Sequence, residues 1–257
     1  MYSCPSYTSE IIFLNTLVIE SDLQVVLLKI SQLSYNNQIM QRTLEPEEIM
    51  DKEENVLAYA KADFSSVNQK FVDALIKKYP NIKIVLDLGC GPGDIPVRLA
   101  KALPNVHITA IDASKKMIAS AKASVTKARL NNHITLVRAY LPGLPFKSKT
   151  FDAIISNSIL HHLPNPLALW EEIKLLGKNE AAIFITDLVR PNSKEKAREM
   201  VECYTANEHP VLKEDFYNSL LAAFTLDEVK AQLIKANLPN LNAEIISDRH
   251  WLVSGIL

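Results

Sequence analysis

The sequence predicts an α/β fold: a doubly wound, mostly parallel sheet of seven strands, with helices on both faces and an antiparallel last strand. Five short apolar runs alternate with helical stretches between residues 82 and 187. Strands that are apolar on both faces and separated by helices are typical of a parallel sheet covered on each side. Two more strand-like runs near the C-terminus are separated by only two residues, too few for a crossover, so we expect them to pair antiparallel.

The predicted elements follow one another in a regular order. Two helices come first, over residues 46–60 and 65–79. The apolar runs predict strands over residues 82–88, 107–112, 134–139, 151–156 and 181–187, and the stretches between them predict helices over residues 96–102, 115–128 and 165–175. Residues 243–247 and 250–256 form the predicted hairpin that closes the sheet.

This order divides the chain into an N-terminal extension and one domain. We interpret residues 1–44 as an extension that is disordered or not native, with Met40 as the working start; the alternative is a helix or strand packed on the core. Residues 45–257 then form a single domain, with lid helices over residues 45–79 and an inserted helical cap over about 192–226. The cap is longer than a simple crossover, which favours a role in substrate choice.

Charge and cysteine usage exclude several functional classes. The 257 residues carry a formal net charge of −1 and three widely spaced cysteines. Binding to nucleic-acid phosphates usually shows as a basic excess, so we expect no nucleic-acid partner. An odd cysteine count without a CxxC pair argues against a disulfide framework and favours the reducing cytoplasm. No uninterrupted apolar run reaches the roughly 20 residues of a membrane span, so we expect a cytoplasmic monomer or homodimer without such a span.

Half of the six glycines lie in one stretch, V-L-D-L-G-C-G-P-G-D, over residues 85–94. Glycines after the first strand of a parallel sheet let backbone N–H groups approach a ligand closely. The dinucleotide fingerprint has the spacing G-x-G-x-x-G, whereas this loop has G-x-G-x-G followed by Asp94. A carboxylate at a helix start repels a pyrophosphate. Together with Asp87, Asp94 favours a ligand that carries an ammonium group.

The stretch D-L-G-C-G-P-G resembles the first motif of class I S-adenosylmethionine-dependent methyltransferases, which have a Rossmann-like fold. The resemblance extends over residues 85–187 and includes L-P-F and H-H-L, as in the ubiquinone/menaquinone-type small-molecule branch. It implies S-adenosyl-L-methionine as the cofactor. The contacts that it implies are Asp87, Gly89, Cys90 and Gly91 for the methionine part, Asp112 for the ribose hydroxyls, and Ala113, Met117, Tyr140, Leu141, Asn157 and Tyr59 around the rest of the cofactor.

One motif departs from the family pattern. Close relatives carry G-D-A-x-x-L-P-F after the third strand, and the Asp helps to hold the adenine. This chain has A-Y-L-P-G-L-P-F, which places Tyr140 in the Asp position. We expect Tyr140 or Leu141 to stack or pack on the base instead.

The resemblance implies methyl transfer to a small-molecule acceptor by in-line displacement. Candidates for handling a proton of the acceptor are His161, Asp187 and His250, because each is predicted at the cofactor edge of the sheet. If the last strand pairs with the fifth, His250 comes near Asp187. No metal-ligand spacing is evident, so we expect no metal. The alternatives are a cofactor-binding homologue or partner subunit without catalysis and, less favoured by the loop spacing, an NAD-dependent oxidoreductase.

The acceptor pocket is expected in the variable parts of the chain. Aromatic side chains in and beside the cap could line it, although they could also serve only to pack the helices together. They are Tyr204, His209, Phe216, Tyr217 and Phe224. The acceptor itself is not identified by these residues.

Overall fold

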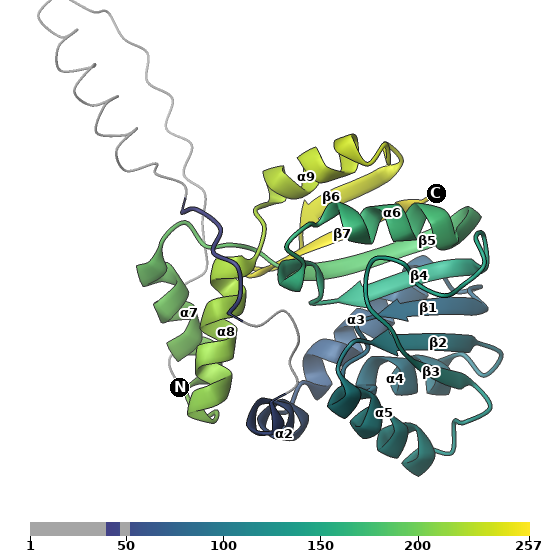
Figure 1. Cartoon of the computed structure of the whole chain (residues 1–257), viewed down its shortest axis with the longest axis horizontal. Coiled ribbons are helices and arrows are strands. Elements are labelled where there is room, and N and C mark those ends of the chain that lie inside the picture. Colours follow the sequence, from purple (N-terminus) through teal and green to yellow (C-terminus); the bar gives the residue numbers. More distant parts are fainter. Residues whose placement is uncertain (1–39, 47–51) are drawn as a thin grey trace, which may run out of the picture.

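A computed structural model describes residues 40–46 and 52–257, and it contains one sheet of seven strands in the order β3-β2-β1-β4-β5-β7-β6 (Figure 1). All neighbours are parallel except β7, which runs antiparallel to both β5 and β6. The strands are β1 (Ile84–Leu88), β2 (His107–Asp112), β3 (Ile134–Arg138), β4 (Phe151–Asn157), β5 (Gly177–Leu188), β6 (Leu241–Ile245) and β7 (His250–Ile256). The predicted fold class is therefore confirmed.

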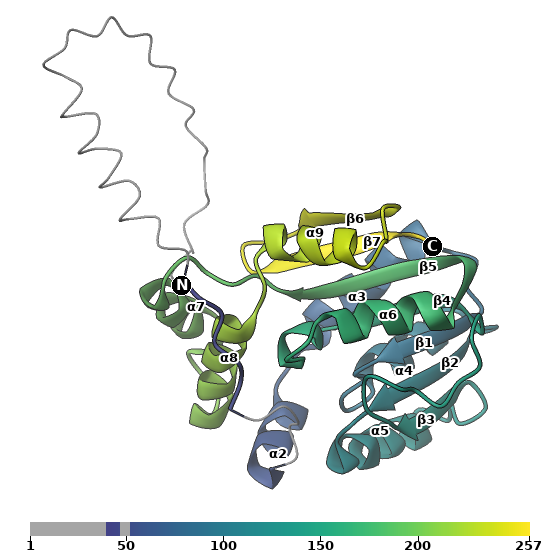
Figure 2. The same cartoon turned by 45° about the horizontal axis from the view of Figure 1, so that its top comes forward.

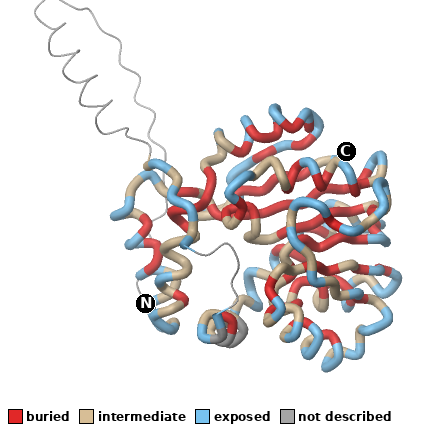
Figure 3. The backbone as a smooth tube through the Cα atoms, viewed as in Figure 1, coloured by how far each residue is buried: buried red, intermediate tan, exposed pale blue. Residues whose placement is uncertain are grey.

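Helices cover both faces of this sheet because alternate strand residues point to opposite sides. On one face, Val85 of β1 shares a core with α3 (Ser65–Lys78), α4 (Asp94–Ala102) and α5 (Lys115–Lys127). On the other face, Leu86 shares a core with α6 (Leu167–Leu176) and α9 (Leu226–Lys235). Buried residues follow the strands, and exposed residues follow the outer sides of the helices (Figure 3).

Three more helices lie beyond the carboxyl ends of the central strands (Figure 2). They are α2 (Glu53–Lys61), α7 (Lys194–Thr205) and α8 (Pro210–Ala222). The last two correspond to the predicted cap and have a small apolar core of their own, which includes Met200 and Leu220. The ends of the cap meet, since Val189 and Phe224 form an isolated bridge and Arg190 N donates to Phe224 O at 3.3 Å.

Residues 40–46, here called the N-terminal strap, run along α8. The Thr43 N–H donates to Leu221 O at 3.0 Å, and the Arg42 guanidinium donates to Ala222 O at 2.6 Å. Residues 40–44 thus contact the fold, although the sequence predicted them as part of an extension. The prediction for residues 1–39, and the first turns of the helix predicted over 46–60, lie outside the described residues.

Local features explain the element that was not predicted and the strand whose start was placed too late. Helix α9 was not predicted, yet Thr225 and Glu228 form a capping box at its start: Glu228 N donates to Thr225 Oγ1 at 3.3 Å, and Thr225 N donates to Glu228 Oε2 at 2.9 Å. Strand β5 begins earlier than predicted, because its first residues pair with Phe151 of β4 before a register shift. None of the described helices has the length and apolar character needed to cross a membrane.

We expect Thr225→Ala to lower the free energy of unfolding by about 1 kcal/mol, because it removes the side-chain acceptor of the α9 cap. Urea unfolding measures this, and Thr126→Ala, on the exposed face of α5, serves as the control. Equal midpoints for the two variants would contradict a stabilising cap at Thr225.

Candidate functional site

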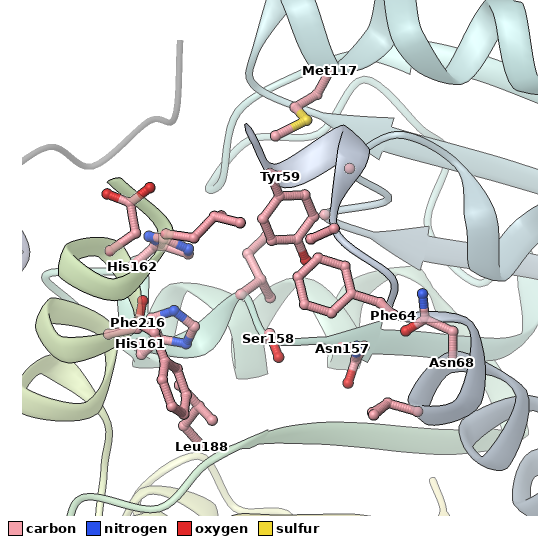
Figure 4. Close-up of a pocket in the computed structure, with 18 of the residues that line it drawn as sticks. Tyr59, Phe64, Asn68, Met117, Asn157, Ser158, His161, His162, Leu188 and Phe216 are labelled. Carbon is pink, nitrogen blue, oxygen red and sulfur yellow. The ribbon is translucent and has the colours of Figure 1, made fainter. Parts of the chain in front are cut away.

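A cavity of about 400 Å³ lies at the carboxyl edge of the sheet, between the glycine loop and helices α2, α7 and α8. In Figure 4, His161, His162 and Phe216 lie on one side of it, Phe64 and Asn68 lie on the other, and Met117 lies at one end. Nine of the eleven predicted cofactor contacts line this cavity: Gly89, Gly91, Asp112, Ala113, Met117, Tyr140, Leu141, Asn157 and Tyr59. The cavity also reaches His161 and His250.

The glycine loop is held by the neighbouring strand. Gly89 N and Cys90 N both donate to Ile111 O, at 2.9 and 2.8 Å. Gly89 and Gly91 have φ values of +77° and +52°, in the left-handed region that favours glycine. A Cβ on Gly89 would lie 2.8 Å from Ile159 Cδ1, whereas a Cβ on Gly91 would meet nothing within 4 Å. The backbone at Gly91 therefore faces open space, where a ligand can approach it.

Asp112 is fixed beside this loop at the end of β2. Its Oδ2 accepts Gly91 N–H at 2.9 Å, and its Oδ1 accepts Ser114 N–H at 2.8 Å. Ser114 in turn caps α5 by accepting Met117 N–H at 3.1 Å. These bonds orient a half-buried carboxylate at the cavity wall, and such a group can accept hydrogen bonds from ligand hydroxyls.

Two predicted cofactor contacts do not line this cavity. Asp87 is 2% exposed, and its Oδ2 has no hydrogen-bond partner among the described residues. Burial, followed by the charge of Asp112, raises the pKa of Asp87 to about 8. Cys90 borders a smaller cavity of about 270 Å³, which shares Gly89, Gly91 and Tyr59 with the first. Burial raises the pKa of its thiol well above the ordinary value, so Cys90 is a packing residue rather than a nucleophile.

Aromatic and apolar groups surround the far end of the cavity. Tyr140, 47% exposed, accepts a hydrogen bond from Arg138, whose guanidinium carbon lies 5.4 Å from its ring centroid. The rings of Tyr59 and Phe64 lie 4.7 Å apart. Burial, with smaller effects of Asp112 and Asp94, raises the pKa of Tyr59 to about 12, so its hydroxyl stays protonated. Tyr140 thus offers a ring face at the cavity wall.

His161 and Asp187 form a buried pair at the other end of the cavity. Their exposed fractions are 3% and 1%, and His161 Nδ1 lies 2.5 Å from Asp187 Oδ1. His161 belongs to a short 3₁₀ helix, η2 (Leu160–His162), whose backbone His161 N–H also donates to Asp187 Oδ2 at 3.2 Å. Burial would lower the pKa of His161, but Asp187 and Glu45 outweigh it and the pKa is raised. The same pairing lowers the pKa of Asp187 against the effect of its burial.

His250 lies near this pair, as the strand order requires. It opens β7 and is in register with Leu188, next to Asp187 on β5. Its Nδ1 lies 3.0 Å from Ser247 Oγ. Burial, followed by the charge of Arg249, lowers the pKa of His250 to about 4, so this imidazole is neutral at pH 7.

The structure places a further residue, Glu45, beside His161 and His162, and no spacing in the sequence indicates this. Its Oε2 lies 2.7 Å from His162 Nδ1, outside hydrogen-bonding angles, and its Oε1 lies 3.7 Å from His161 Nε2. These three residues could supply metal ligands, since their ligand atoms lie within 4.8 Å of one another. Two ligands on one tetrahedral ion stand about 3.3 Å apart at the usual bond lengths. The 2.7 Å approach of Glu45 Oε2 to His162 Nδ1 is shorter than this separation and is a direct contact between the two side chains, and the expectation of no metal stays a prediction.

The cap contributes fewer aromatic rings to the cavity than the sequence suggested. Tyr204 and Phe216 line it, but His209, Tyr217 and Phe224 do not. Tyr217 and Phe224 instead pack with the strap and the cap core. Tyr204 donates to Asp248, and the guanidinium carbon of Arg249 lies 3.6 Å from its ring centroid.

The His161–Asp187 pair predicts a pH-dependent contribution to stability. The pKa of His161 is raised in the folded state, so its contribution is complete below the ordinary value of 6.5 and is lost as the pH rises through the folded value. The depressed pKa of Asp187 makes the pair fully stabilising above its ordinary value of 3.8.

We therefore expect His161→Asn to destabilise most between about pH 4 and 6.5. Above this window, the loss of unfolding free energy relative to the parent protein should shrink by about 1.4 kcal/mol for each unit by which the pKa of His161 is raised. Urea unfolding from pH 5 to 9 measures this, with His107→Asn at an exposed site as the control. A deficit that is constant with pH would contradict the ion pair.

Comparison with known proteins matches the central part of the chain to one family model. Residues 85–179 match the model described as "Methyltransferase domain". A demethylmenaquinone methyltransferase of Porphyromonas gingivalis is 32% identical over 111 residues, 42% of this chain and 45% of that protein. A release factor glutamine methyltransferase of Rhodopirellula baltica is 40% identical over 73 residues, 28% of this chain and 25% of that protein.

These curated relatives are matched over less than half of their own lengths. A crystal structure of a SAM-dependent methyltransferase from Aquifex aeolicus aligns with a TM-score of 0.59 at 20% identity, and the alignment covers 80% of this chain and 99% of that one. At this level of identity the likeness establishes the fold.

Proposed function

We propose that this chain, whose residues 85–179 match a methyltransferase domain model, transfers a methyl group from S-adenosylmethionine to a small-molecule acceptor by in-line displacement. The observation that carries the proposal is the cavity that joins Gly91 and Asp112 to His161, which is paired with the buried Asp187. One end offers contacts for a nucleoside with an amino-acid tail, and the other offers a group that can take a proton. The protein's main task in such a reaction is to place the acceptor in line with the methyl group.

The residues at the loop end fit the cofactor. When bound, S-adenosylmethionine supplies an electrophilic methyl group on a sulfonium. The open backbone at Gly91 and the oriented carboxylate of Asp112 suit the amino-acid tail and the ribose hydroxyls, and Tyr140 and Leu141 suit the base. A cationic group near the loop would also favour the ionised form of Asp87, whose buried oxygen has no partner among the described residues.

At the acceptor end, His161 is the candidate proton acceptor, and Asp187 orients it. A histidine with a raised pKa accepts a proton well only once it is neutral, so activity should rise with pH through that pKa. His250 is the second candidate. Because its pKa is about 4, it would give activity that is flat across neutral pH.

The cavity suits a small organic acceptor with an apolar part. Leu188, Leu212 and Phe216 supply apolar surface at the acceptor end. The likeness to a demethylmenaquinone methyltransferase supports an aromatic ring as one such acceptor. A protein glutamine, which the second relative's name suggests, is a less favoured acceptor because of the enclosing cap.

Calorimetry with S-adenosylhomocysteine tests the cofactor assignment. We expect binding of this compound and none of NAD. Asp112→Asn should weaken the binding by about tenfold or more, the effect of losing one charge-assisted hydrogen bond. Asp227→Asn, on the exposed start of α9, is the matched control. Binding of NAD alone would favour an oxidoreductase.

A screen of small acceptors with release of S-adenosylhomocysteine as the readout tests the reaction. For any acceptor found, we expect His161→Gln to lower kcat by about 100-fold or more, as the loss of a general base does. Its affinity for S-adenosylhomocysteine should stay unchanged, and the exposed His107→Gln should retain full activity. A protein that binds the cofactor but retains full turnover after His161→Gln would move the role to His250.

A further inference from the structure

The N-terminal strap contacts the acceptor end of the cavity through two charged side chains. Resting on the proposed function, we propose that Arg42 and Glu45 are positioning residues of the acceptor site, which hold η2 in place and set the orientation and charge state of His161. Both lie upstream of the segment that matches the methyltransferase model, residues 85–179.

Arg42 joins the strap to two other backbone segments, the end of α8 and η2. Its Nε donates to Ala222 O at 2.6 Å, and its Nη2 donates to His161 O at 2.8 Å and to Leu163 O at 3.0 Å. The last carbonyls of a helix have no partner within the helix, so the strap caps the C-terminus of α8. The guanidinium carbon also lies 4.0 Å from the ring centroid of Phe224. Arg42 thereby fixes η2 relative to the cap.

Glu45 acts on the histidine side chains themselves. Ser219 Oγ of α8 donates to its Oε1 at 2.6 Å, which holds the carboxylate over the two imidazoles. Its side chain is only 10% exposed, and the two imidazole centroids lie 4.2 Å apart. Burial alone would raise the pKa of Glu45, but the nearby histidines outweigh this effect and the pKa is lowered.

His161 therefore lies between two carboxylates. Asp187 of β5 holds its Nδ1 at 2.5 Å, and Glu45 faces its Nε2 at 3.7 Å. The second distance is longer than a hydrogen bond, so Glu45 acts on Nε2 through its charge and does not bond to it. Among the described residues, two more charged or titratable groups face the ring of His161. Arg42 of the strap lowers the pKa of His161, and the ring of His162 lies beside it. Helix α8 presents the Ser219 hydroxyl, which bonds to Glu45. A carboxylate thus faces each of the two ring nitrogens of His161.

Glu45→Gln in the full-length chain tests this arrangement. The substitution keeps the shape and removes one carboxylate beside His161. NMR titration of the His161 ring, assigned with His161→Asn, should show its pKa lowered by about one unit or more. The rising limb of the kcat–pH profile should move down by the same amount, and kcat should fall by roughly tenfold or more as His161 loses its placement.

The matched control is Glu171→Gln, an exposed glutamate on α6 with a side chain 60% exposed. It should change neither the titration nor the profile. In Glu45→Gln, affinity for S-adenosylhomocysteine and the melting temperature should stay close to the parent values, which separates positioning from folding. Arg42→Lys, which keeps the charge but not the three-carbonyl geometry, should lower kcat while leaving that affinity unchanged.

The proposal is overturned if Glu45→Gln leaves the His161 pKa and the profile unchanged, or if it loses turnover only together with cofactor binding and fold. Stoichiometric zinc binding that Glu45→Gln abolishes would overturn it too, since the cluster would then be a metal site. The NMR titration needs no turnover. A parent protein without activity would thus refute the proposed function, while the His161 titration still decides the role of Glu45.

Discussion

The buried pairing of Asp187 with His161 is the interaction on which the functional edge depends. A carboxylate at the end of a central strand is expensive to bury unless charge and hydrogen bonds compensate it. Here the imidazole and two backbone N–H groups, from His161 and Leu188, converge on it. Because these partners come from η2 and from the strand itself, satisfying one charge fixes η2 against the end of β5. The strap then places a second carboxylate, Glu45, beyond the ring.

Much of the fold follows from local patterns in the sequence. The limits of β2 and β7 were predicted to the residue, because each is a short apolar run between turn or charged residues. The spacing between the last two strands predicted their antiparallel pairing, which places His250 beside the end of β5. Helix α9 was not predicted from the hydrophobic pattern of its sequence, although the T-L-D-E sequence at its start is a capping signal.

The residues of the candidate site also divide into those that the sequence predicts and those that it does not. Residues at or just after the end of a strand, such as Asp112, Asn157 and Gly91, could be predicted at the cavity because the carboxyl ends of parallel strands meet at one edge. Glu45 and Arg42 were not, since their role depends on a long-range return of the chain to α8 that no local spacing encodes. Asp87 is the intermediate case: its motif identified it, but its burial beneath the loop follows from packing that only the structure shows.

The bridge between Val189 and Phe224 has a consequence for how such a protein can change. The two ends of the cap leave and re-enter the fold side by side, so α7 and α8 form a cassette whose exchange leaves the order and register of the strands intact. Closing a loop of different length at this point costs little extra entropy. Variation within this one segment would reshape the cavity wall around Leu212 and Phe216 and leave Gly91 and Asp112 in place.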